Sequence, residues 1–199
     1  MSLKVCTLVT SIILTPSLTI LFIEPPLSEI ISVLNHESVN LYAETLIKEF
    51  GRKFRQDGST AAGLEVLKEF LKNAGTDTNG MYIEDGSGLS PTNAINAAGL
   101  TKLLFYMKNS GKYFREYYAS LPDAGKNGTL KSYFNSQIFD SRLKAKSGSM
   151  TRVISYAGYI TTLSGRQLIF SIIINNFTGP SRPVVNDIEE VIKELIINY

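Results

Sequence analysis

The stretch R-L-K-A-K-S-G-S-M-T-R-V, residues 142–153, places reactive side chains at the opening of a predicted strand. They are consecutive: Lys146, Ser147, Gly148 and Ser149. An ammonium and a hydroxyl here suit the binding of a carboxylate, while the glycine leaves room for a second extended chain alongside. The plain alternative is an edge strand with a bulge, in which the lysine discourages aggregation.

Two further motifs are short and weak when taken alone. S-V-N places Ser38 and Asn40 between two predicted helices, where both side chains are also good helix caps. D-G-S-G-L-S begins at residue 85 and is typical of a tight loop. Its candidate residues for lining a cleft are Asp85, Ser87 and Gly88.

Together the motifs fit serine acyl transfer without histidine. Such a site needs a nucleophile, a group that moves protons, an oxyanion hole and a cation for a terminal carboxylate. Serine β-lactamases and penicillin-binding proteins meet these needs with S-x-x-K, S-D-N and K-T-G. This chain contains S-V-N and K-S-G in the same order.

Composition narrows the alternatives. With 199 residues, 44% hydrophobic and 19% charged, the chain suits one globular domain. A net charge of +2 gives no reason to expect nucleic acid as a partner. A single cysteine, Cys6, and a single histidine, His36, argue against a disulfide, a metal site and a Ser-His-Asp triad. We therefore expect no cofactor and no metal.

Hydrophobic periodicity predicts helices around a strand meander. The expected helices are 28–35 (capped by Ser28), 40–50 (stopped by Gly51), 60–74, one ending near Gly111, a short one at 114–118, and 184–197. The expected strands are 142–148, 152–163 and 167–177. This order predicts an α/β chain of the layered α+β kind, one domain over 1–199 with an antiparallel sheet covered by helices.

The N-terminal segment is ambiguous. Residues 5–23 carry no charge, which is also a property of signal peptides and membrane spans. Pro16 lies in the middle, and no small-residue cleavage site follows, so we expect two strands, 4–14 and 18–23. For residues 1–17, a strand, a tag remnant and a targeting-like segment remain alternatives.

Five stretches, in order, resemble the C-terminal part of the low-molecular-mass class C penicillin-binding proteins. These are bacterial serine D-alanyl-D-alanine carboxypeptidases and endopeptidases of peptidoglycan metabolism. The stretches are P-P-L-S-E-I-I at 25–31, S-V-N-L-Y-A-E at 38–44, E-D-G-S-G-L-S at 84–90, L-P-D-A-G-K-N-G-T-L at 121–130 and A-K-S-G-S-M at 145–150. The resemblance implies a partial serine β-lactamase/DD-peptidase (transpeptidase-like) fold, located in the periplasm or otherwise outside the cytoplasm.

The resemblance also implies residue roles. Ser38 would relay a proton, and Asn40 would hold the substrate amide or orient the lysine of S-x-x-K. Lys146 and Ser147 would bind the carboxylate of D-Ala, with Gly148 beside them. The backbone N–H of Ser149 would form half of the oxyanion hole, and the loop of Asp85, Ser87 and Gly88 would flank the cleft.

One motif departs from the family pattern. The chain has a single S-x-x-K, from Ser141 to Lys144, and it runs directly into K-S-G. Residues i and i+3 of a strand point to opposite faces, so we expect these two side chains not to meet. The chain is thus expected to carry half an active site and no nucleophile, and to be inactive alone. In an intact parent the partners would be D-Ala-D-Ala stem peptides or β-lactams.

Two alternatives remain at this point. One is a non-catalytic module that binds peptidoglycan stems or a protein. Another is an unrelated α/β protein with chance motifs, in which Ser38 and Lys146 would lie far apart. Independently of function, a truncated sheet would leave an unpaired edge, so a homo-oligomer formed through that edge is expected.

Overall fold

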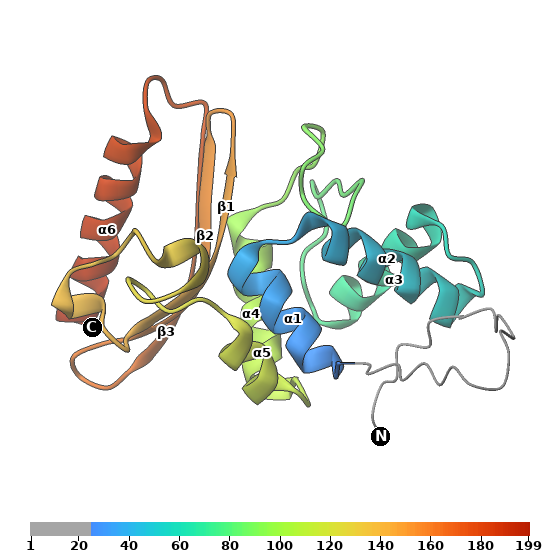
Figure 1. Cartoon of the computed structure of the whole chain (residues 1–199), viewed down its shortest axis with the longest axis horizontal. Coiled ribbons are helices and arrows are strands. Elements are labelled where there is room, and N and C mark those ends of the chain that lie inside the picture. Colours follow the sequence, from blue (N-terminus) through green and yellow to red (C-terminus); the bar gives the residue numbers. More distant parts are fainter. Residues whose placement is uncertain (1–24) are drawn as a thin grey trace, which may run out of the picture.

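The computed structural model describes residues 25–199, so the strands predicted at 4–14 and 18–23, and the alternatives for 1–17, lie outside the described residues. Figure 1 shows a sheet between a single helix and a group of helices. The helices are α1 (Leu27–Glu37), α2 (Asn40–Arg55), α3 (Thr60–Asn73), α4 (Ala97–Ser110), α5 (Phe114–Ser120) and α6 (Ser181–Asn198). The strands are β1 (Leu143–Met150), β2 (Val153–Thr161) and β3 (Gln167–Asn175), and short 3₁₀ turns occupy Gly128–Leu130 and Gln137–Phe139.

The sheet is the predicted antiparallel meander, in the order β1-β2-β3. In its register Lys146 lies opposite Ala157, and Ser147 lies opposite Tyr156. Side chains alternate between the two faces of a strand, so Ser147 shares a face with the buried Ala145, whereas Lys146 lies on the other face. The K-S-G motif therefore presents side chains on both faces of the sheet.

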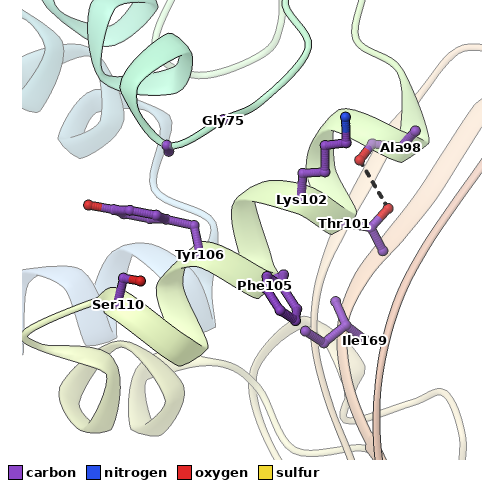
Figure 2. Close-up of a pocket in the computed structure, with 9 residues that line it drawn as sticks. Gly75, Ala98, Thr101, Lys102, Phe105, Tyr106, Ser110 and Ile169 are labelled. Atoms are coloured by element: carbon purple, nitrogen blue, oxygen red, sulfur yellow. Dashed lines mark hydrogen bonds between the residues drawn. The ribbon is translucent and has the colours of Figure 1, made fainter.

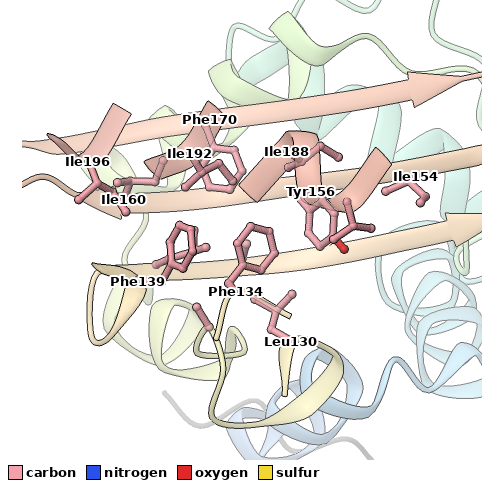
Figure 3. Close-up of a cluster of buried hydrophobic side chains, with 14 residues drawn as sticks. Leu130, Phe134, Phe139, Ile154, Tyr156, Ile160, Phe170, Ile188, Ile192 and Ile196 are labelled. Atoms are coloured by element: carbon pink, nitrogen blue, oxygen red, sulfur yellow. The ribbon is translucent and has the colours of Figure 1, made fainter. Parts of the chain in front are cut away.

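The main core lies between the sheet and α6. Ile188, Ile192 and Ile196 recur at helical spacing on α6 and are buried against the strands. Figure 3 shows these isoleucines facing aromatic side chains of β2 and β3, with residues of the segment before β1 along one side of the core. The aromatic and aliphatic partners labelled there are Ile154, Tyr156, Ile160, Phe170, Leu130, Phe134 and Phe139.

A smaller core joins the opposite face of the sheet to α4 and α5. It is built on buried Leu104, Leu121 and Tyr159. The Tyr159 hydroxyl donates a hydrogen bond to the Leu104 carbonyl at 2.9 Å, and burial raises the pKa of Tyr159. This bond fixes α4 against β2 and so places the helical half of the molecule relative to the strands.

Several expected helix boundaries are wrong. The last helix begins at Ser181 and not at 184, and the first ends at Glu37 and not at 35. Helix α1 begins at Leu27 after an extended Pro26, which has no N–H to satisfy, so Ser28 lies inside the first turn and is not its cap. Helix α2 continues through Gly51 to Arg55. Gly51 faces α3 so closely that a Cβ would lie 2.8 Å from the Gly63 nitrogen, so this glycine permits helix packing and does not end the helix.

No helix within residues 25–199 is long and apolar enough to cross a membrane. A cavity of about 540 Å³ opens between the end of α3, α4 and β3. Figure 2 shows Phe105, Tyr106 and Ile169 among its walls. None of the predicted site residues lines this cavity, so the candidate site must be sought elsewhere.

The packing of α6 generates the first prediction. Ile192→Ala removes a fully buried side chain and should lower the free energy of unfolding by about 2–5 kcal/mol. The matched control is Ile197→Ala on the same helix, where the side chain is 44% exposed and the change should stay within about 0.5 kcal/mol. Urea denaturation followed by circular dichroism measures both, and equal losses would contradict the described orientation of α6.

Candidate active site

Ser38 ends α1 and contacts a residue far away in sequence. Its backbone is left-handed, with φ 54° and ψ 51°, which costs a non-glycine residue about 1–2 kcal/mol. Its Oγ accepts a hydrogen bond from Lys146 Nζ at 2.9 Å, across 108 residues. The structure therefore joins the S-V-N and K-S-G motifs, and it excludes the alternative in which Ser38 and Lys146 lie far apart.

The alternative role of Ser38 and Asn40 as helix caps is wrong. Val39 occupies the position before α2, and no side chain caps that helix. Asn40 is the first residue of α2, with an exposed side chain that has no hydrogen-bond partner among residues 25–199. Its amide is thus free for a ligand, although its predicted role remains a prediction.

Lys146 lies at the edge of β1 and is half-buried. Besides Ser38, its Nζ donates to the backbone carbonyl of Ser147 at 2.9 Å. Burial lowers the pKa of Lys146, because desolvation penalises the charged amine. No ion pair with a carboxylate within residues 25–199 offsets this effect, so a cation stands unneutralised beside an accessible hydroxyl.

The remaining residues of the K-S-G stretch differ in their surroundings. Ser147 Oγ donates to Thr129 Oγ1 at 2.7 Å. A Cβ on Gly148 would lie 2.6 Å from Ser155 Oγ, so the glycine accommodates a neighbouring strand as well as leaving the edge clear. Ser149 is exposed, and the oxyanion role of its N–H remains a prediction.

The D-G-S-G-L-S loop is hydrogen-bonded to α2. Glu44 Oε1 accepts the backbone N–H groups of Gly86 at 3.1 Å and Ser87 at 2.8 Å. Asp85 Oδ1 accepts the N–H of Gly88 at 2.6 Å, and Gly88 has a φ of +78°. The loop is thereby fixed beside the helix that starts at Asn40, while no hydrogen bond links it to Lys146.

Sequence reasoning overlooked two residues of this region. Thr129 lies in the L-P-D-A-G-K-N-G-T-L stretch, which carried the resemblance but received no role. Glu44 is the last residue of S-V-N-L-Y-A-E and anchors the loop described above. Both could have been found from the sequence, because each is a polar side chain without an assigned role inside a stretch that carries the resemblance.

As predicted, the side chains of Ser141 and Lys144 do not meet to form a nucleophile–base pair. Lys144 Nζ donates to Asp123 Oδ2 at 2.9 Å and to the Leu121 carbonyl at 3.2 Å. Ser141 lies in a turn before β1, and its Oγ accepts from Lys126 Nζ at 3.1 Å. The two side chains serve separate structural contacts.

The environment of Lys146 predicts a pH dependence of stability. Its folded-state pKa is lowered from 10.5, so between that lower value and 10.5 the unfolded chain binds more protons. This residue should therefore make the folded state more stable as pH rises through that window. Urea unfolding at several pH values measures the free energy of unfolding of the wild type and of Lys146→Met. The difference between the two should rise with pH in this window. Lys102→Met on α4 removes the same charge and is the control. A flat difference would contradict the desolvation of Lys146.

Solved structures share the fold of this chain. Penicillin binding protein 4 from Haemophilus influenzae superposes with a TM-score of 0.81 at 22% identity, covering 86% of this chain and 40% of that one. A class A β-lactamase from Bacteroides cellulosilyticus gives a TM-score of 0.64 at 15% identity, covering 85% of this chain and 63% of the other. The predicted serine β-lactamase/DD-peptidase fold is confirmed.

Sequence relatives carry the comparison further. The chain is 35% identical over 166 residues to a D-alanyl-D-alanine carboxypeptidase from Actinomadura sp. (strain R39), covering 81% of this chain and 30% of the relative. It is 30% identical over 173 residues to carboxypeptidase DacB from Mycolicibacterium smegmatis, covering 84% and 38%. The chain thus spans about a third of the length of these relatives. The profile of one family matches residues 22–198, and the chain belongs to that family, the D-Ala-D-Ala carboxypeptidase 3 (S13) family.

Proposed function

We propose that this chain carries the S-x-N and K-S-G part of a serine-type D-Ala-D-Ala carboxypeptidase or endopeptidase active site. The observation that carries the proposal is the 2.9 Å hydrogen bond from Lys146 Nζ to Ser38 Oγ. It brings two motifs of the acyl-transfer set into one constellation at an accessible edge of the sheet. The substrate class is the D-Ala-D-Ala end of a peptidoglycan stem peptide, and the location is outside the cytoplasm.

The charge at this edge suits a terminal carboxylate. Lys146 is partly desolvated and has no carboxylate partner among residues 25–199, so an incoming anion would favour its charged form. A charge-assisted hydrogen bond to a carboxylate is about twice as strong as a neutral one. Ser147 adds a hydroxyl from the next position on the strand.

Names of the relatives support the same substrate class. The Actinomadura protein is a D-alanyl-D-alanine carboxypeptidase, and Haemophilus influenzae penicillin binding protein 4 has been crystallised with a β-lactam. A Bdellovibrio bacteriovorus endopeptidase with the same fold is acylated by penicillin G. Because the single S-x-x-K of this chain is divided between a turn and β1, we propose that the chain alone forms no acyl-enzyme.

A second candidate is a non-catalytic module that binds the stem peptide. It is favoured because residues of this chain already hold Lys146 and Ser147 in place, through Ser38 and Thr129. Side chains that are already held in place need little further ordering before a ligand binds. Binding without turnover is what this candidate requires.

The chain should bind a D-Ala-D-Ala peptide without being acylated. Titration of N-acetyl-D-Ala-D-Ala, followed by NMR, should saturate, and Lys146→Ala should weaken binding by about tenfold or more because a charged hydrogen bond is lost. Lys102→Ala, remote on α4, is the control.

Incubation with a fluorescent penicillin should leave no covalent label on a denaturing gel. Absence of saturable binding would reduce the chain to an inert fragment of the family. Stable labelling would overturn the proposal that the chain alone forms no acyl-enzyme, and its loss in Ser141→Ala would identify Ser141 as the nucleophile.

Self-association through the sheet is a separate proposal. The second half of β1 and the outer edge of β3 have no neighbouring strand within residues 25–199. Open edges pair readily with another chain, so we expect a concentration-dependent dimer. Multi-angle light scattering over a dilution series measures this, and a monomer mass throughout would refute it.

A further inference from the structure

The Thr129 hydroxyl lies against the K-S-G strand from outside the sheet. It accepts the hydrogen bond of Ser147 Oγ at 2.7 Å, and both side chains are partly accessible. A threonine hydroxyl offers one proton and two lone pairs. With one lone pair used by Ser147, Thr129 keeps a proton that it can donate at the same edge.

The backbone of this turn is held from both sides. Leu130 is fully buried in the main core, next in sequence to Thr129. On the other side, Gly128 has a φ of +53°, and a Cβ there would lie 2.7 Å from the carbonyl oxygen of His36. The turn therefore packs against the last turn of α1, two residues before Ser38, and it has little freedom to move Thr129 away from Ser147.

Carboxylate binding requires donors, and this sets a condition on the hydroxyl pair. In the ligand-free arrangement the Ser147 proton is used by Thr129. A carboxylate at the edge needs that proton, and Ser147 gives it up at least cost when its own oxygen gains another donor. Thr129 can supply one by rotating its proton toward Ser147, so that the hydrogen bond reverses and no hydroxyl is left unpaired.

We propose that Thr129 is a positioning residue for the carboxylate-binding edge, acting through the hydroxyl of Ser147. The inference rests on the proposal that this edge binds a terminal carboxylate. Thr129 holds the Ser147 side chain at the edge and exchanges the direction of their hydrogen bond when an anion binds. Thr129 should therefore increase the preference of the site for a ligand with a C-terminal carboxylate over one with an uncharged C-terminus.

The test compares variants of the full chain at position 129. Thr129→Val keeps the shape and removes the hydroxyl, whereas Thr129→Ser keeps the hydroxyl. Each is titrated with N-acetyl-D-Ala-D-Ala and with its C-terminal carboxamide, and the ratio of the two affinities is measured by NMR. Thr101→Val on α4, which loses a hydroxyl bonded to the Ala97 carbonyl, is the matched control.

The acid-to-amide affinity ratio should be the same in the wild type, Thr129→Ser and Thr101→Val. In Thr129→Val the ratio should fall about tenfold. Circular dichroism melts confirm that each variant is folded, and a merely structural role would not alter the acid-to-amide ratio of a folded variant. An unchanged ratio in Thr129→Val overturns this role and leaves the proposed function standing. A wild type that binds neither ligand, or both equally, overturns the proposed binding of a terminal carboxylate at this edge and this inference with it.

Discussion

The site depends on how the segment 121–130 is wedged against the first half of β1. Backbone N–H groups of Ala124 and Ala145 donate to the carbonyls of Leu143 and Pro122, so the segment acts as a short extra strand there. Beyond Ala145 this pairing stops and the strand edge is open, at the point where Lys146 and Ser147 lie. The same segment buries Leu130 in the core, which anchors it from beneath. Where the edge opens is thus decided by packing and not by the K-S-G residues themselves.

Two lysines on β1, two positions apart, show how environment separates structure from chemistry. Lys144 faces Asp123 and stacks 5.5 Å from the ring centre of Tyr118, so its charge is compensated locally. Lys146 shares that face of the strand but meets a hydroxyl and a carbonyl. An ammonium paired with a carboxylate gains little from a second anion, whereas one that meets only neutral oxygens is available to a ligand. The alternation of the strand places both lysines on the same face, and only their neighbouring groups distinguish the structural lysine from the one available to a ligand.

Much of this arrangement was accessible from the sequence, within physical limits. The three-strand meander, its helical covers and the association of Ser38 with Lys146 followed from hydrophobic periodicity and from motif resemblance. The predicted end of α2 was wrong, because a glycine at position 51 indicates a helix end unless the close approach of α3 is known. Thr129 was overlooked for a similar reason: its contact with Ser147 depends on tertiary packing across 18 residues of chain. Local pattern predicts elements well, but it does not predict which side chains meet between them.

The left-handed backbone of Ser38 has an evolutionary consequence. Glycine would relieve the strain at that position, so stability alone favours its replacement. A serine there is worth its conformational cost only while its hydroxyl has a use, here as the acceptor for Lys146. In descendants of this chain that are no longer under selection for the site, glycine should replace serine at position 38 early. The residue at this position therefore indicates whether the Ser38–Lys146 pair is still functional.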